Sequence, residues 1–296
     1  MSRPASPPPG RRSTPRPDFG SATVIRRVDV AHHVWGDTEA GFVTDRVIVS
    51  TANLHVLEFE LPPGGEFRHS ALNPTVFAGD VLYFVLAGEL VLADPSTGEV
   101  ALVPAGTGRL FHRDTWHNGF NPGRTTVRVL EFFSPPPARG TSSDYARSQP
   151  ALETSVFADQ RWRGRWPEAR AEQQATAAFL VADPAAGLLR FRDAQASHLL
   201  SILVDTPYLR VAQGSVAAGH VEDFAAVETE SLVVVTSGEL WVDVWNEPDG
   251  YRATSVLQPG DAMYLPVGAS ERMLVRAAEP ATYLRGWGEV PEGWTP

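Results

Sequence analysis

Short alternating runs of apolar and polar residues make up most of the chain, and Gly or Pro ends nearly every run. In the first half these runs are LHVLEFELPPGGEFRH, DVLYFVLAGELVLADPSTGEVALV and TTVRVLEFFSP, the second of which contains a Pro-Ser-Thr-Gly turn. Alternation with a period of two, in segments rich in β-branched and aromatic residues, predicts strands that bury one face. The first half is therefore predicted to be an all-β domain.

The second half contains a similar series in the same order: PYLRVAQGSVAAGH, SLVVVTSGELWVDVWNEPDGYRATSVLQPGD and ATYLRGWGEV. His69 lies 19 residues before Gly88 of LAGELVL, and His220 lies 18 residues before Gly238 of TSGELWV. Self-similarity over this distance indicates an internal duplication. We therefore predict two related antiparallel β-barrels or sandwiches.

Two stretches interrupt the alternating pattern. The N-terminal MSRPASPPPGRRSTPRPDFG is rich in arginine and proline and has no apolar run, so it is predicted to be disordered. Between the halves, ARGTSSDYARSQP is a polar loop and RWPEARAEQQATAAFLVA has the composition of a short helix. The predicted division is a disordered tail (1–20), an N-terminal barrel (21–137), a partly helical connector (138–198) and a C-terminal barrel (199–296).

Composition narrows the function classes. The 296 residues carry a net charge of −10, which repels phosphate backbones and anionic membrane surfaces, so no nucleic-acid or membrane partner is expected. The absence of cysteine excludes disulfides, thiolate metal sites and a cysteine nucleophile, and leaves histidines and carboxylates as protein ligands. No apolar run approaches the length of a membrane span, and the N-terminus lacks the apolar stretch of a signal peptide. We predict a cytoplasmic protein.

Two segments, GELV…PAGTGRLFHRDTWHNGFN and GELWV…LQPGDAMYLPVGASERML, resemble the second motif of the bicupins of the cupin superfamily, G-x5-P-x-G-x2-H-x3-N. The first segment matches this motif at Gly106, His117 and Asn121. The second segment matches its framework at Gly260, Pro266 and Gly268, but Glu271 stands in the His slot and Val275 in the Asn slot. The resemblance implies an all-β fold of two cupin-type barrels (double-stranded β-helices, or jelly rolls), of which the second has a degenerate site.

The first motif of this family, G-x5-H-x-H-x3,4-E-x6-G, supplies the other metal ligands, and the chain departs from it. His69 is near the first His slot, but Ala71 stands two residues further on, and the Glu slot holds Val81. Asp80 precedes that slot by one residue, which moves a strand side chain to the opposite face. The resemblance therefore implies His69 and His117 as metal ligands, with Asp80 as a third ligand only if the strand bulges.

His112 and His117 lie five residues apart, so on one extended strand they face opposite sides. His112 also occupies the slot of the family's proline. We predict that His117 faces the barrel interior and that His112 does not bind the same metal.

The candidate catalytic residues are His69, His117 and Asp114, the last placed to orient an imidazole. The candidate substrate contacts are Tyr83, Trp116, Arg68 and Asn121. Other interpretations stay open at this point, because the two histidines can equally be hydrogen-bonded interior residues without a metal. Tyr83 and Trp116 can be core aromatics, and Arg68 can be a salt-bridge partner rather than an anchor for a substrate carboxylate.

Three function classes remain for a chain that acts on a small organic molecule. The first is an enzyme of the dioxygenase or isomerase type with one divalent transition metal (Fe, Mn, Ni, Cu or Zn) in the N-terminal barrel and none in the C-terminal barrel. The second is a metal-free isomerase, dehydratase or cyclase that uses histidine as general acid or base. The third is a non-catalytic small-molecule-binding bicupin.

An enzyme is favoured over a binding protein, because polar residues persist at interior slots of the first barrel while the second barrel is expected to have lost them. Of the two enzyme classes the first is preferred, because the resemblance implies that His69 and His117 sit on opposite strands of the family's metal site. Whether the chain forms a homodimer is left open.

Overall fold

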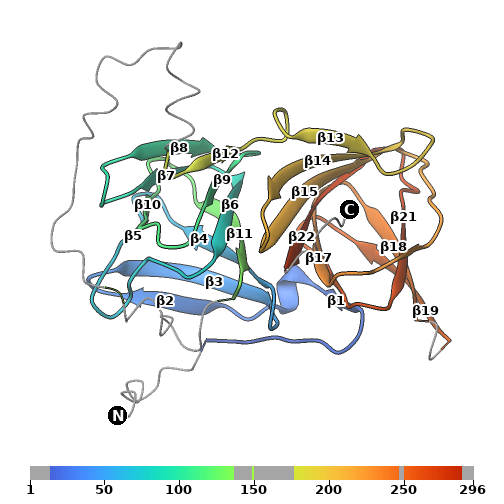
Figure 1. The fold of residues 1–296 in the computed structure, drawn as a ribbon, viewed down its shortest axis with the longest axis horizontal. Coiled ribbons are helices and arrows are strands. Elements are labelled where there is room, and N and C mark those ends of the chain that lie inside the picture. The colour runs from blue at the N-terminus through green and yellow to red at the C-terminus, as the bar shows by residue number, and fades with distance from the viewer. Residues whose placement is uncertain (1–13, 137–148, 150–176, 247–249, 289–296) are drawn as a thin grey trace.

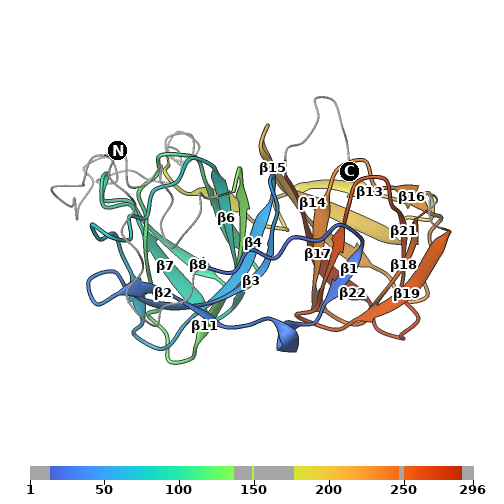
Figure 2. The ribbon, with the colours of Figure 1, turned by 90° about the horizontal axis from the view of Figure 1, so that it is seen from below.

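The structure, a computed structural model of the chain, describes residues 14–136, 149, 177–246 and 250–288. Over these residues the protein is built from antiparallel strands, with one 3-10 turn at η1 (Arg27–Asp29). Two barrels lie side by side (Figures 1 and 2). Each barrel combines a seven-stranded sheet with a four-stranded sheet, which confirms the predicted all-β architecture. No helix in the described part of the chain is long and apolar enough to cross a membrane.

Eleven strands build the first barrel, and all but the last come from the N-terminal half. These strands are β2 (His33–Asp37), β3 (Gly41–Ser50), β4 (His55–Leu61), β5 (Glu66–Phe67), β6 (Asp80–Ala87), β7 (Glu89–Ala93), β8 (Val100–Pro104), β9 (Gly108–Phe111), β10 (Asn118–Phe120), β11 (Val127–Ser134) and β12 (Leu180–Ala182). The larger sheet has the order β12-β9-β6-β11-β4-β3-β2, and the smaller has the order β5-β10-β7-β8.

The second barrel also contains eleven strands. They are β1 (Thr23–Ile25), β13 (Leu188–Phe191), β14 (His198–Asp205), β15 (Leu209–Val216), β16 (Ala225–Ala226), β17 (Ser231–Ser237), β18 (Leu240–Asn246), β19 (Tyr251–Leu257), β20 (Ala262–Leu265), β21 (Ser270–Leu274) and β22 (Ala281–Gly288). The orders β1-β20-β17-β22-β15-β14-β13 and β16-β21-β18-β19 repeat those of the first barrel strand for strand.

Irregularities of strand pairing recur as well. The register shifts at Val85/Ala87 on β6 and at Val235/Ser237 on β17, at the same distance before Gly88 and Gly238. The duplication predicted from sequence is therefore present in the fold, down to the position of individual bulges.

Each large sheet ends with a strand that comes from outside its own half of the sequence. β1, which was predicted to lie in the first barrel, pairs with β20 of the second barrel. β12 comes from the predicted connector and pairs with β9 of the first barrel. An open sheet edge needs a partner, and pairing there outweighs the weak helix propensity of the segment that ends at residue 182. Residues 165–176 of the segment expected to be helical lie outside the described residues.

The predicted disorder of residues 1–20 does not extend to the described residues 14–20. The backbone N–H of Ser50 donates to the carbonyl oxygen of Pro17 at 2.7 Å. The ring centroid of Phe19 lies 5.8 Å from that of Tyr264, in the cluster between the barrels. These contacts fix the segment, because they provide a hydrogen-bond partner and a buried apolar contact that composition does not reveal. Residues 1–13 lie outside the described part.

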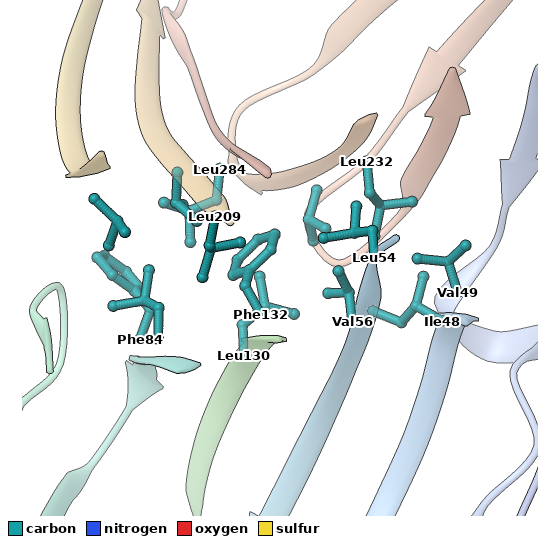
Figure 3. Close-up of a cluster of buried hydrophobic side chains, with 14 of the residues drawn as sticks. Ile48, Val49, Leu54, Val56, Phe84, Leu130, Phe132, Leu209, Leu232 and Leu284 are labelled. Atoms are coloured by element: carbon teal, nitrogen blue, oxygen red, sulfur yellow. The ribbon is translucent and has the colours of Figure 1, made fainter. Parts of the chain in front are cut away.

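The two large sheets pack against each other through one apolar cluster (Figure 3). Its labelled members are Ile48, Val49, Leu54, Val56, Phe84, Leu130 and Phe132 from the first barrel and Leu209, Leu232 and Leu284 from the second. A Cβ at Gly286 would lie 2.3 Å from the Phe132 ring, so a glycine lets the sheets approach closely. The run VLYFVL (81–86) lacks charged residues because its odd and even residues are both turned away from solvent, one set inside the barrel and one set between the barrels.

Candidate functional site

A cavity of about 100 Å³ lies inside the first barrel. Its wall is largely aromatic, and includes Trp35, Phe59, Phe67, Phe77 and Phe133. Nine polar residues also line it, namely Thr14, Arg16, His33, Asp45, His55, Thr75, Tyr83, His117 and Glu131. An apolar cavity with a few convergent polar groups is the usual form of a small-molecule site.

Strand alternation explains how the polar groups reach this cavity. On β6, Leu82 belongs to the cluster between the barrels, so its neighbour Tyr83 faces the interior. On β11, Leu130 belongs to the same cluster, so Glu131 also faces inward. Tyr83 and Glu131 are direct cross-strand partners. Their side chains therefore stand next to each other on the cavity wall.

His117 is completely buried and contacts Tyr83. Its Nε2 lies 3.2 Å from the Tyr83 hydroxyl, and its Nδ1 lies 3.2 Å from the carbonyl oxygen of Thr115. A carbonyl only accepts hydrogen bonds, so Nδ1 carries the proton and Nε2 accepts from the Tyr83 hydroxyl. Burial lowers the pKa of His117 to about 4, although the Thr115 carbonyl acts in the opposite sense. His117 is therefore a neutral imidazole at pH 7.

Glu131 is a carboxyl group of the cavity with a strongly altered acidity. Burial raises its pKa to about 8, and the nearby charge of Asp45 adds to this effect. Burial also raises the pKa of Asp45, whose Oδ2 lies 3.6 Å from Nδ1 of His33. Glu131 has no hydrogen bond to any residue that the structure describes. At neutral pH it is a protonated carboxyl group that faces a cavity with its hydrogen-bonding capacity unused.

The ligands predicted for a metal in this barrel do not converge. His69 packs its ring against Trp116, with the centroids 4.7 Å apart, and neither residue lines the cavity that His117 faces. Asp80 has the same strand parity as Leu82 and points out of the barrel, where its Oδ1 lies 2.9 Å from Nδ1 of His112. β6 pairs with β11 without a bulge at Asp80. The set His69, His117 and Asp80 therefore does not fit a metal ion.

The orientation predicted for the two motif histidines agrees with the structure. His117 faces the interior, whereas the side chain of His112 is 54% exposed and pairs with Asp80 on the outside.

Replacing His112 by Ala should therefore change the free energy of unfolding by less than about 1 kcal/mol, because an ion pair with one exposed partner contributes little. Urea unfolding of the wild type and the variant measures this difference. A loss of more than about 2 kcal/mol would show that the Asp80–His112 pair holds the barrel wall together.

Three other predicted site residues occupy turns or the surface. Asp114 is exposed, has a φ of 66° and pairs with Arg113. Arg68 is exposed, and its Nε donates to the carbonyl of Glu39 at 2.8 Å. Asn121 is buried, and its amide donates to the carbonyls of Leu61 and Thr125 at 2.9 Å each, as a turn-stabilising residue does. Of the predicted site residues, only His117 and Tyr83 line the cavity.

The second barrel contains many polar groups, so the expectation that its interior has lost them is wrong. His198, His220 and Glu222 form one buried group, in which one ligand atom of each lies within 4.8 Å of the others. The sequence does carry a signal for two of them. Gly214 precedes His220 by the spacing of the family's first motif, and Glu222 stands in the second His slot. His198 begins β14 and belongs to neither motif, so no local pattern points to it.

A second cluster of polar side chains in this barrel is centred on Glu271. Glu271 accepts from Arg285 at 2.6 Å and from Arg192 at 2.7 Å, and the Arg285 guanidinium also bonds the Ser231 hydroxyl. Burial alone would raise the pKa of Glu271, but the two arginines outweigh it and lower the pKa to about 2.

The same strand positions carry different chemistry in the two barrels. Glu271 follows Gly260 at the distance at which His117 follows Gly106. Arg285 is the cross-strand partner of Val233, the counterpart of Tyr83, so it corresponds to Glu131. Where the second barrel has an ion pair, the first barrel has a neutral imidazole and a carboxyl group around a cavity.

No protein-family model and no curated protein matches the sequence. Solved structures do match in fold. A putative glyoxylate-induced protein from Pseudomonas aeruginosa has a TM-score of 0.63 at 14% identity and covers 99% of this chain and 98% of its own. The oxalate decarboxylase of Lactobacillus farciminis, in a formate complex, has a TM-score of 0.60 at 13% identity over 93% of this chain and 88% of its own.

A cupin 2 conserved barrel domain protein from Leptotrichia buccalis has a TM-score of 0.50 at 15% identity over 83% of this chain and 88% of its own. The chain therefore has the bicupin fold, as its motifs predict. At these identities the likeness defines the fold alone, and the chemistry has to be argued from the site.

Proposed function

We propose that the protein is an enzyme of the bicupin fold that converts a small organic molecule in the cavity of the first barrel by proton transfer. The observation that carries this proposal is Glu131, a buried carboxyl group with a pKa of about 8 and no hydrogen bond to the described residues. Carboxyl groups whose acidity burial alters this strongly are concentrated at sites of function.

The acidity of Glu131 suits it to move protons near neutral pH. A general acid or base works best when its pKa is close to the working pH, because both protonation states are then accessible. A pKa of about 8 meets this condition, whereas an ordinary glutamate is ionised at pH 7 and is a weak base. Glu131 is accordingly the proton-transferring residue of the proposed reaction.

Tyr83 and His117 supply the second half of the site. The Tyr83 hydroxyl stands beside Glu131 and is held by Nε2 of His117. Burial raises the pKa of Tyr83 well above its ordinary value, so the hydroxyl keeps its proton. Without substrate it donates that proton to Nε2 of His117, and it would turn to donate it to a bound substrate oxygen instead. A substrate oxygen between Tyr83 and Glu131 would be polarised by one group while the other takes a proton from, or returns it to, the adjacent carbon. This arrangement fits an isomerase, dehydratase or cyclase.

The size of the cavity limits the substrate. Its volume of about 100 Å³ is somewhat smaller than the roughly 150 Å³ of an engineered cavity that accepts benzene. The aromatic wall favours an uncharged or largely apolar molecule, of the size of a single ring or smaller. A cytoplasmic location, the absence of nucleic-acid and membrane partners, and homodimer formation stay predictions.

Proton exchange in D2O tests the proposal before the substrate is identified. A panel of small ketones, keto acids and cyclic enols is incubated with the protein, and NMR follows deuterium entering the carbon next to the carbonyl. We expect exchange for at least one compound and about a hundredfold slower exchange with Glu131→Gln, the range that acid–base catalysis contributes.

Asp80→Asn is the matched control for this experiment, since Asp80 is a buried carboxylate at the start of β6 that points out of the barrel. It should leave the exchange rate unchanged. Exchange that survives in Glu131→Gln would contradict the assigned role. Binding of panel compounds without exchange would instead favour the non-catalytic binding class.

A further inference from the structure

His198, His220 and Glu222 meet at one place in the second barrel, away from the cavity of the proposed function. Oε2 of Glu222 lies 2.9 Å from Nδ1 of His198 and 3.4 Å from Nε2 of His220. The side chains of all three residues are buried. His198 is the first residue of β14, whereas the other two belong to the loop between β15 and β16.

The hydrogen bonds around His220 determine where its proton lies. The Ser197 hydroxyl donates its one proton to the Asp193 carboxylate, so its oxygen can only accept from Nδ1 of His220, 2.8 Å away. A neutral His220 then presents the lone pair of Nε2 to the Glu222 carboxylate. Two acceptors facing each other require a cation between them, which is either a proton or a metal ion.

A metal ion accounts for this geometry better than a proton. A hydrogen bond across 3.4 Å is longer than the usual range of about 2.7–3.2 Å, so a proton accounts for the 2.9 Å contact of Glu222 with His198 but not for its contact with His220. Around an ion with bonds of about 2.1 Å, neighbouring ligand atoms are separated by about 3.0 Å in octahedral and about 3.4 Å in tetrahedral geometry. The separations of 2.9 and 3.4 Å are short enough for one ion to reach all three ligand atoms.

The outer partners of the three residues also match those of a metal site. Nε2 of His198 lies 2.7 Å from the Tyr283 hydroxyl, and Nδ1 of His220 is held by Ser197. Metal-bound histidines usually have such a partner on the other ring nitrogen, which fixes the ring orientation. Oε1 of Glu222 accepts from the backbone N–H of Met273 at 2.8 Å, which leaves Oε2 for the ion.

We propose that Nδ1 of His198, Nε2 of His220 and Oε2 of Glu222 hold one divalent transition-metal ion, which fastens the β15–β16 loop to β14. Two imidazoles and one carboxylate select ions such as Zn²⁺, Mn²⁺, Fe²⁺ or Co²⁺ over Mg²⁺ and Ca²⁺, which prefer oxygen ligands. His220 and Glu222 stand at slots of the family's first motif, whereas His198 lies outside both motifs. Glu271, at the slot of the second-motif histidine, accepts hydrogen bonds from Arg285 and Arg192 and is not part of the proposed metal site.

Metal titration of the full chain tests this site independently of any enzymatic activity. The purified protein is stripped with a chelator and titrated with Co²⁺, followed by visible absorption, and with Zn²⁺, followed by calorimetry. We expect one equivalent to bind. At about a hundredfold excess over Kd, Zn²⁺ should raise the Tm by roughly 5 °C or more.

Isosteric variants locate the ion. Glu222→Gln keeps an acceptor for the Met273 N–H and should weaken metal binding at least tenfold. His198→Gln, as a separate single variant, should also weaken metal binding at least tenfold. Glu230→Gln is the matched control, because Glu230 is an equally buried carboxylate of this barrel that bonds Tyr264 instead. His117→Gln should also bind like the wild type.

Three results would overturn the proposal: no binding by the stripped wild type, unchanged affinity in Glu222→Gln, or loss of binding in His117→Gln. The last result would place the metal in the first barrel and would bear on the proposed function. The first two results would leave the proton-transfer chemistry of Glu131 untouched.

Discussion

The Glu131→Gln variant is expected to be more stable than the wild type at pH 9, by roughly 3–5 kcal/mol, and about equally stable at pH 4. The pKa of Glu131 is about 8 in the folded protein and has an ordinary value of 4.5 in the unfolded chain. At about 1.4 kcal/mol per pH unit, this difference amounts to a few kcal/mol in the free energy of unfolding.

The direction follows from proton binding. Below about pH 4.5 the carboxyl group is protonated in both states and its contribution is fully present. Between pH 4.5 and 8 the unfolded chain gives up its proton while the folded protein keeps it, so stability falls as the pH rises. Above about pH 8 the folded protein ionises as well, and the loss is complete. The glutamine of the variant does not titrate, so the variant avoids this loss.

Urea unfolding at several pH values from 4 to 9 measures the effect as the difference between the two proteins. Taking the difference removes the contributions of His117 and His55, whose pKa values burial lowers to about 4 and about 3. Those histidines destabilise both proteins in the same way as the pH falls below 6.5. Parallel stability curves for variant and wild type would show that Glu131 is ionised or paired at neutral pH. If Glu131 is functional, the Glu131→Gln variant should be more stable than the wild type and should have lost activity.

The second large effect is expected at Glu271. Replacing it by Leu should destabilise the protein by about 3–5 kcal/mol, because the buried Arg285 would lose its carboxylate partner and the half-buried Arg192 would keep only Glu222. Adding Arg285→Met to this variant should recover part of the loss, with a coupling energy on the order of 2 kcal/mol. An apolar pair of similar volume avoids the cost of an unpaired charge.

A double-mutant cycle, measured by urea unfolding at pH 7, checks this prediction. Asp205→Ala serves as the control, because Asp205 pairs with Arg210 on the surface, where its side chain is 57% exposed. That substitution should cost less than about 1 kcal/mol. If Glu271→Leu lies within about 1 kcal/mol of the wild type, water reaches the arginines and the buried ion pair does not hold the second barrel together.

Local signals in the sequence were sufficient for the orientation of several single residues. The spacing of His117 from Gly106 and Asn121 predicts that it faces inward, and the parity of Asp80 predicts that it faces outward. Both follow from strand periodicity, which a side chain obeys whatever its partners are. The same rule could have revealed Glu131, a lone charged residue among the apolar neighbours of VLEFF, as an inward-facing group.

Strand periodicity could not predict which side chains meet in each site. His69 has the motif spacing of a ligand, but its ring packs against Trp116 and does not line the cavity. In the second barrel, His198 becomes a neighbour of Glu222 only because β14 pairs with β15. No motif contains this pair.

The sequence by itself determined the all-β fold, its duplication and the absence of thiol chemistry, because alternation, glycine spacing and residue inventory are local properties. Only the tertiary structure decided which polar residues converge, and it placed Glu131 beside Tyr83 and His198 beside Glu222. It also decided that β1 and β12 complete sheets in which they were not expected. Convergence depends on the register between strands far apart in the sequence, and a shift of one residue turns every side chain of a strand to the other face.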